Sequence, residues 1–473
     1  MSGGFSYDHD AYGCILITEI DVCALPLIPE EIVMKRSIAC LIACTLIICL
    51  ASCSWSFSIP PAASGSHSSD TAVLEPEAAA VYPDAIAYED YDARSAVRTA
   101  NPLDDNFLAA LQDFSYNTAS SVLLARDGNA NYSPVSLYFA LALAGSGADG
   151  TTRQEFLDLL GMEDTDGLSA QCANLFRRLY TDSGISILRI ADSVWMDSDI
   201  EGRKISFKES FLDNAVNRYF ASLYSVDFSD DAAGKAMSRW IADNTNGTLA
   251  PSMELSDIQI MTLLNTIYFY DEWVNEFDEN LTAAEVFHVS DSKDVTFDFM
   301  NMTLSSQQFF DGDGYIRSSL YMKSGNSMVF ILPDEDVSVD SLLASPEKVR
   351  AIFEGGNASV GEVVFQIPKF GFDSSYDLTD ILKGFGIRSA FDSSADFSGI
   401  TDGPAYISEI RQETHIAVNE KGVEASAFTQ IDFYGSAMPV GRAEMILDRP
   451  FIYGITGTDG TLLFVGVCGN PAV

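Results

Sequence analysis

Basic residues are scarce in this chain. Its 473 residues include 27 Lys and Arg against 68 Asp and Glu, which gives a formal net charge of -41. Proteins that bind nucleic acids neutralise phosphates with Lys and Arg, so this composition excludes a nucleic-acid partner. The excess of acid is typical of a well-solvated surface, and attraction to a basic protein partner is the alternative that it leaves open.

The sequence is also poor in the motifs that bind metals or activate a nucleophile. Its four His and eight Cys form no cluster with the spacing of a metal site. It contains no G-x-S-x-G nucleophile motif. We therefore expect no metal and no cofactor. Cys172 and Cys468 are the cysteines of the folded part, and we expect two buried free thiols, with a disulfide as the alternative.

One apolar run stands near the N-terminus, and it is too short to span a bilayer comfortably. Met34 to Arg36 begin a basic segment, residues 37–50 are apolar, and the run ends in L-A-S-C at Cys53. This is the form of a secretory signal. The ending resembles the cleavage box of bacterial lipoproteins, in which Cys53 becomes the lipidated first residue. A plain signal peptide with an incidental cysteine is the alternative.

These features divide the chain into four parts. Residues 1–33 precede the signal, and we expect the true start to be Met34; residues 34–53 are the lipoprotein signal peptide. Residues 54–101 are rich in Ser, Ala, Pro and acid and are expected to form a disordered tether. Residues 102–473 form the folded domain. The protein would then be extracytoplasmic, either secreted or attached to a bacterial membrane through lipidated Cys53 alone.

Helical patterns dominate the first half of the folded part and strand patterns the second. Residues 103–125 show helical spacing of Leu, Phe and Val, whereas residues 258–270 are a nearly continuous apolar run. Such a run is typical of a central strand buried on both faces. Residues 451–468 predict a hairpin about Thr458 to Gly460. Because no βαβ repeat occurs, we predict one mixed α+β domain with large antiparallel sheets.

The segment EKGVEASAFT, Glu420 to Thr429, has the pattern of a strand where a loop is expected. Residues of one parity are compact and mostly apolar, beginning at Val423, and residues of the other parity are mostly polar, beginning at Glu424. A loop with the pattern of a strand suggests a segment that can exist in two states.

At many points in the same order, the chain resembles the serpin family of protease inhibitors. The segments that carry the resemblance include NYSPVSLYFALAL, MTLLNTIYFYDEW, VVFQIPKF, THIAVNEKGVEASAFT and DRPFIYGI. It covers residues 103–473 and implies a fold of three β-sheets, eight or nine helices and an exposed reactive loop near the C-terminus. It implies a monomeric suicide inhibitor of serine proteases and not an enzyme. A non-inhibitory serpin that acts as a binding protein or decoy substrate is the alternative.

The resemblance also implies roles for single residues of the loop. Gly422 opens the hinge, which comprises Glu420, Gly422, Val423, Glu424, Ala425, Ser426, Ala427 and Thr429. Two positions depart from the usual pattern: Val423 replaces Thr or Ser, and Phe428 replaces a small residue. Counting along the loop places the reactive bond between Ser436 and Ala437, with Met438 as the runner-up. These residues are uncharged, so we predict an elastase-like target protease.

The resemblance also extends to a cluster of polar residues. Ser133, Ser136, Asn265 and His415 match the family's hydrogen-bond network beneath the point where the main sheet opens, and Trp273 matches the aromatic residue at the top of that sheet. A Ser, an Asn and a His could also suggest a hydrolase triad. The resemblance implies instead a structural network, and a hydrolase that uses His415 is the alternative.

Overall fold

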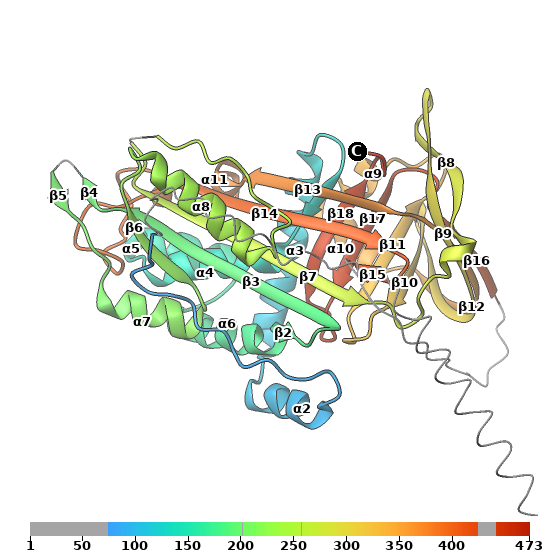
Figure 1. Ribbon diagram of the computed structural model, residues 1–473, viewed down its shortest axis with the longest axis horizontal. Coiled ribbons are helices and arrows are strands. Elements are labelled where there is room, and N and C mark those ends of the chain that lie inside the picture. The colour runs from blue at the N-terminus through green and yellow to red at the C-terminus, as the bar shows by residue number, and fades with distance from the viewer. Residues whose placement is uncertain (1–73, 201, 257, 424–440) are drawn as a thin grey trace, which may run out of the picture. The chain divides into compact units, whose positions relative to one another are not determined.

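A computed structural model describes residues 74–473 of the chain, except 201, 257 and 424–440 (Figure 1). This part has a mixed α/β fold with three sheets and ten α-helices. The helices are α2 (Tyr91–Ala100), α3 (Asp105–Leu124), α4 (Pro134–Ser146), α5 (Gly150–Leu160), α6 (Thr165–Leu179), α7 (Glu209–Arg218), α8 (Asp231–Asn244), α9 (Val339–Leu343), α10 (Pro346–Glu354) and α11 (Thr379–Gly384). Among the described residues, no helix is both long and apolar enough to cross a membrane.

The largest sheet by strand count has nine strands, most of them antiparallel. Its strands follow the order β1-β18-β17-β11-β10-β9-β12-β16, and β8 pairs with β9. The hairpin of β17 and β18 confirms the prediction for residues 451–468. The strands are β1 (Ala130–Tyr132), β8 (Ala283–Ser290), β9 (Lys293–Gly312), β10 (Tyr315–Tyr321), β11 (Ser327–Pro333), β12 (Asn357–Pro368), β16 (Gly441–Ile446), β17 (Phe451–Thr456) and β18 (Leu462–Cys468).

A second sheet of seven strands positions the candidate site; the serpin resemblance implies that the cleaved loop would insert into this sheet, which is here called the insertion sheet. Its order is β13-β14-β15-β7-β3-β2, and β6 pairs with β3. All twelve residues of β7 are buried, which confirms a central strand covered on both faces. The strands are β2 (Thr181–Asp182), β3 (Ser186–Asp197), β6 (Ser222–Val226), β7 (Met261–Glu272), β13 (Phe370–Asp377), β14 (Ile407–Asn419) and β15 (Gly422–Val423); β4 (Asp199–Ile200) and β5 (Arg203–Lys204) form a separate hairpin.

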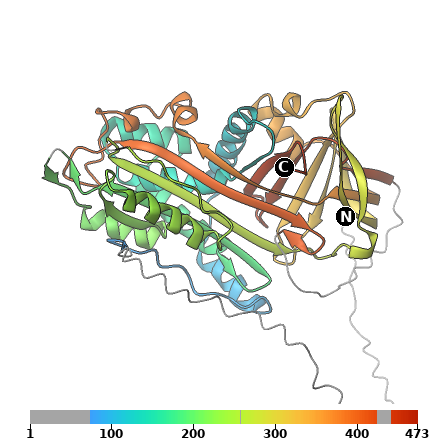
Figure 2. The ribbon, with the colours of Figure 1, turned by 45° about the horizontal axis from the view of Figure 1, so that its top comes forward.

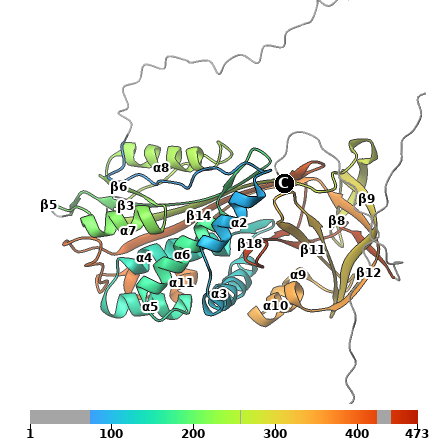
Figure 3. The same ribbon diagram turned by 90° about the horizontal axis from the view of Figure 1, so that it is seen from below.

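Helices cover both faces of the insertion sheet. Helix α8 lies on one face, and α4, α5 and α6 lie on the other (Figure 3). Helix α4 is almost wholly buried, and it begins at Pro134 because Ser133 caps it: the Ser133 Oγ accepts a hydrogen bond from the Ser136 N–H. This cap places two serines directly beneath the sheet. Cys172 and Cys468 are buried free thiols, as predicted.

The expectation of a disordered tether over residues 54–101 is wrong for residues 74–100. Residues 91–100 form α2, and the chain before them packs on the insertion sheet. Ala78 bridges Leu223 on strand β6, with backbone hydrogen bonds in both directions. The ring of Tyr82 stacks on Tyr180 at a centroid distance of 5.7 Å. Residues 74–88, here the N-terminal strap, therefore cover the edge strand β6, which would otherwise offer unpaired backbone groups.

The strap gives a first prediction. Tyr82→Ala removes the ring that stacks on α6 and the hydroxyl that donates to Asn244 on α8, so the free energy of unfolding should fall by about 2 kcal/mol. Urea unfolding followed by circular dichroism measures this loss. Tyr321→Ala is the matched control, because the Tyr321 side chain is 53% exposed. Equal losses for the two variants would contradict a packed strap.

Candidate functional site

The insertion sheet is split at one end by the start of the hinge. Gly422 and Val423 form β15, which lies between β14 and β7 and runs antiparallel to both. Val423 pairs with Val418 on one side and Asp271 on the other. Away from this end, β14 and β7 pair directly, in parallel, from Ile407 to Thr414. Figure 2 shows these two long strands side by side.

This arrangement is an incomplete strand position. To extend β15 along the sheet, the parallel pairing of β14 with β7 must break, and two antiparallel ladders would replace it. Antiparallel pairing is slightly more stable per residue than parallel pairing. The exchange therefore gains hydrogen bonds on two sides and loses them on one. The remaining hinge residues Glu424, Ala425, Ser426, Ala427 and Thr429, and the bond at Ser436, Ala437 and Met438, lie outside the described residues, as does Cys53.

Gly422 is required by the close approach of β15 to β7. A Cβ atom at this position would collide with the backbone carbonyl oxygen of Asp271 and the Cα of Glu272. Val423, the next residue, is 2% exposed and packs in the main hydrophobic core. Val423 thus faces the side of the insertion sheet on which the main hydrophobic core lies.

Glu420 anchors the chain just before β15. One of its carboxylate oxygens accepts from Lys369 Nζ at 3.0 Å, and the other accepts from Thr282 Oγ1 at 2.9 Å. Burial alone would raise the pKa of Glu420, but hydrogen bonds from its own backbone N–H, Lys369 and Thr282 outweigh burial and lower it. At neutral pH the Glu420 carboxylate is therefore charged, and Lys369 and Thr282 hold it in place.

Trp273 holds the turn that leads into β15. It follows the last residue of β7 and is fully buried. Its Nε1 donates to the Asn419 carbonyl at 3.0 Å, and its backbone N–H donates to the Lys421 carbonyl at 2.9 Å. The structure thus places Trp273 at the split end of the sheet.

A buried hydrogen-bond network lies beneath the parallel part of the β14–β7 pairing. Ser136 Oγ donates to Asn265 Oδ1 at 2.8 Å, and Asn265 Nδ2 donates to Asp192 Oδ1 at 2.7 Å. Gln412 Nε2 donates to Asn265 Oδ1 at 3.0 Å and to the Ser133 carbonyl at 2.9 Å. These bonds connect α4 with β3, β7 and β14. Because Gln412 and Asn265 face each other across the β14–β7 pair, a strand that entered between them would break their hydrogen bond.

The network corrects one predicted member. His415 lies on the opposite face of β14, and its Nδ1 contacts Asp373 Oδ1 at 2.6 Å. Successive side chains of a strand alternate between faces, so Gln412 and Thr414 point inward and His415 points outward. Gln412 and Asp192 are the members that sequence reasoning missed. His415 does not contact Ser133 or Ser136, so these residues do not form a catalytic triad.

Asp192 carries a buried carboxylic acid next to this network. Burial raises its pKa to about 7, although the hydrogen bond from Asn265 opposes the shift. Among the described residues, its Oδ2 has no hydrogen-bond partner. Asp271, which pairs with Val423 on the split end, is also buried, and its pKa is likewise raised to about 7, against hydrogen bonds from Ser324 and Asn326.

The raised pKa of Asp192 predicts a pH dependence of stability. The folded state keeps the proton up to pH near 7, while the unfolded chain releases it near 4, so the free energy of unfolding should fall as pH rises between these values. Asp192→Asn removes this contribution and should stabilise the protein at pH 8 by up to about 4 kcal/mol. Urea unfolding at several pH values measures the slope.

Asp402→Asn is the matched control for this prediction, because the Asp402 side chain is 93% exposed. Asp271 contributes a slope of the same sign, so Asp192→Asn should reduce the pH dependence rather than abolish it. An unchanged slope in Asp192→Asn would show that the carboxyl group is charged throughout.

The site offers no arrangement for bond-breaking chemistry of its own among the residues that the structure describes. In this part of the chain, no group of three or more His, Cys, Asp or Glu is placed to hold a metal ion. The geometry instead offers a position for a further strand between β14 and β7. The hydrogen bond between Gln412 and Asn265 closes this position.

Comparisons with known proteins agree with this geometry. The family model described as "Serpin (serine protease inhibitor)" matches residues 109–471. Serpin-ZXA of Oryza sativa subsp. japonica is 31% identical over 366 residues, which cover 72% of this chain and 90% of the rice protein. The native-state crystal structure of tengpin, a thermophilic serpin, is 25% identical with a TM-score of 0.69, over 78% of this chain and 95% of tengpin.

A second solved structure, that of AtSerpin1 from Arabidopsis, is described as a native stressed conformation. It is 26% identical, with a TM-score of 0.67, over 79% of this chain and all of the Arabidopsis protein.

Proposed function

The chain belongs to the serpin family of serine protease inhibitors, and from this premise we propose that it is a suicide substrate that traps its protease by strand insertion. The observation that carries the proposal is β15. Gly422 and Val423 of the hinge already lie between β14 and β7, where the rest of the hinge would continue the same strand.

The first step of the proposed mechanism is ordinary acyl transfer. The serine of the protease attacks the carbonyl carbon of Ser436, the amine of Ala437 leaves, and an ester joins Ser436 to the protease. The cut separates the hinge from β16, which begins at Gly441. The hinge is then free to extend β15, and the ester carries the protease with it.

The second step is insertion of the hinge, driven by the backbone hydrogen bonds that it would form with β14 and β7. Some ten to fourteen residues would gain backbone hydrogen bonds at about 0.5–1.5 kcal/mol net each, on the order of 10 kcal/mol in all. A strand of about fourteen residues, at about 3.3 Å per residue, would move the attached protease by roughly 45 Å. Distortion of its catalytic groups then slows release of the ester, since small misplacements strongly reduce catalysis.

The expected target is an elastase-like serine protease. Ser436, Ala437 and Met438 are small or unbranched and carry no charge, so they suit an apolar pocket better than one that requires Arg or Lys. The proposed location is outside the cytoplasm of a bacterium, with Cys53 lipidated and residues 34–53 acting as the signal peptide. Membrane contact would depend on this lipid alone, and the protein would act as a monomer.

Incubation with an elastase tests the proposal. We expect a covalent complex that survives SDS and, by mass spectrometry, a released peptide that begins at Ala437. Trypsin is the control, and efficient trapping of trypsin without trapping of elastases would reject the target class. Cleavage by every protease tested, without any complex, would favour a non-inhibitory binding protein or decoy substrate.

A further inference from the structure

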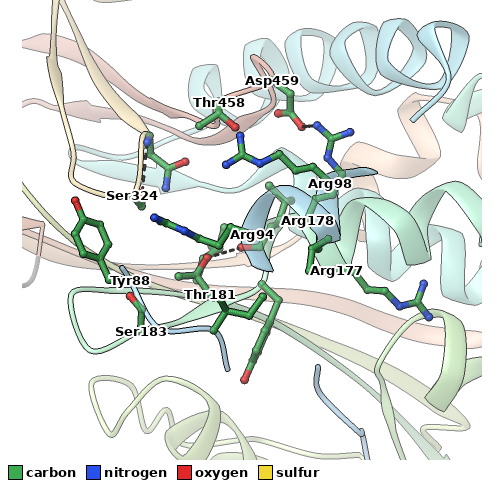
Figure 4. A pocket seen from close by; sticks show the side chains of 16 residues that line it. Tyr88, Arg94, Arg98, Arg177, Arg178, Thr181, Ser183, Ser324, Thr458 and Asp459 are labelled. Atoms are coloured by element: carbon green, nitrogen blue, oxygen red, sulfur yellow. Dashed lines mark hydrogen bonds and ion pairs between the residues drawn. The ribbon is translucent and has the colours of Figure 1, made fainter. Parts of the chain in front are cut away.

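A small basic cavity lies between the N-terminal segment and the body of the domain. Its volume is about 90 Å³, and α2, the end of α6, the turn after β2, the turn between β10 and β11 and the turn between β17 and β18 contribute to its walls. Four of the 27 basic residues of this acidic chain line it: Arg94, Arg98, Arg177 and Arg178. Figure 4 shows these side chains.

The four arginines differ in their ion-pair and hydrogen-bond partners. Arg178 contacts Asp459, the acidic residue of the lining, at 3.5 Å. Arg177 points away from the other three in Figure 4 and donates to the Asn217 carbonyl. Arg94 and Arg98 have no carboxylate partner among the described residues. The buried Nε of Arg94 also has no hydrogen-bond partner there.

Arg94 is half-buried and Arg98 is exposed, and without a counter-ion their placement carries a small repulsion. They stand four residues apart on α2, where like charges repel each other and destabilise a helix. The rings of Tyr88 and Tyr91 lie within 5.1 Å and 4.6 Å of the Arg94 guanidinium and offset part of this cost. An anion in the cavity would neutralise both charges and supply acceptors for the unpaired donors.

We propose that this cavity binds a compact tetrahedral oxyanion, phosphate or sulfate, either free or as the end group of an ester. A guanidinium group offers two parallel N–H donors to such an anion, and Arg94, Arg98 and Arg178 place three of these groups around one space. A volume of about 90 Å³ suits a group of this size and not a drug-sized molecule. The hydroxyl of Thr458 is a further donor on the wall.

Binding would have a structural consequence. The anion would link α2, which lies outside the residues matched by the family model, to α6 and to the turn between β17 and β18. It would therefore fasten the N-terminal segment to the body and stabilise the folded state by mass action. This site does not depend on the proposed inhibitory function: a chain that fails to trap proteases can still bind the anion.

The melting temperature of the full chain, measured against inorganic phosphate at constant ionic strength, tests the site. We expect a rise that saturates. General stabilisation by phosphate or sulfate exclusion does not saturate, so a purely linear rise would overturn the proposal. In Arg94→Gln/Arg98→Gln the saturable rise should disappear, while the control Arg203→Gln, on the exposed hairpin strand β5, should keep it. A saturable rise that persists in the double variant would also overturn it.

A second measurement avoids the risk that the double variant folds poorly. Calorimetric titration of the wild type with phosphate, sulfate and glycerol 3-phosphate compares a free ion with an ester, and Arg98→Gln alone should weaken binding about tenfold. Similar binding of phosphate and sulfate supports a free-ion site, and tighter binding of glycerol 3-phosphate supports an ester end group. Absence of binding by all three would refute the site.

Discussion

A single cut in residues 424–440 is expected to raise the melting temperature of the protein by roughly 10–20 °C. In the described residues β15 comprises Gly422 and Val423, and β14 and β7, which pair directly from Ile407 to Thr414, could accept a much longer antiparallel strand between them. Once the hinge is free of β16, it can fill this position and gain on the order of 10 kcal/mol in backbone hydrogen bonds. The nicked protein should therefore be more stable than the intact one, which reverses the usual effect of proteolysis.

Differential scanning calorimetry of the intact and the elastase-nicked protein measures this rise. The nicked chains must stay together, which gel filtration checks. A cut in the exposed hairpin of β4 and β5 is the control, because that hairpin lies outside the insertion sheet and its loss should not raise the melting temperature. If the loop-nicked protein melts at or below the temperature of the intact one, the insertion mechanism fails.

Strands with a continuous apolar run were predictable from the sequence. β7 is buried along its whole length, and the hairpin of β17 and β18 has a turn signal at Asp459 and Gly460 between two apolar runs. In both cases the identity of the residues determines burial without knowledge of the neighbours. The same is true of α3, whose bounds lie within two residues of the range predicted from its helical spacing.

The polar network was predictable only in part, because its members belong to four elements. On β14, a shift of one residue moves every side chain to the other face. The residues Ile410, Gln412, Thr414, Ile416 and Val418 share the buried face, and this alternation was a usable signal that excludes His415. No such signal exists for Asp192, because its burial follows from its pairing with Asn265 on a neighbouring strand.

The N-terminal strap escaped prediction for a different reason. It uses one backbone bridge at Ala78 and one aromatic stack at Tyr82, and neither produces a periodic pattern. The composition, rich in Ala, Pro and acid and without a sustained apolar period, suggested disorder. The packing of the strap depends on Leu223, Phe176 and Tyr180, which are supplied by elements more than ninety residues away in the sequence.

Because Val423 faces the hydrophobic core, its orientation predicts which substitutions in the hinge would block insertion. Because side chains alternate along a strand, Ala425, Ala427 and Thr429 would follow Val423 into the core during insertion, and Ser426 would face the other side. Ala427→Arg would bring an unpaired charge into the core, at a cost of several kcal/mol. We expect this variant to be cut at the normal rate and to release the protease, so that the yield of SDS-stable complex falls about a hundredfold.

Ser426→Arg is the matched control, since it adds the same side chain one residue away on the opposite face. A barrier increase of about 3 kcal/mol in insertion corresponds to a hundredfold slower trapping, whereas hydrolysis of the ester does not involve residue 427 and keeps its rate. The partition between complex and cleaved inhibitor therefore measures the difference directly. Equal complex yields for the two variants would mean that the hinge does not enter the sheet in the register set by β15. In that case the nicked Ala427→Arg protein should gain as much heat stability as the nicked wild type.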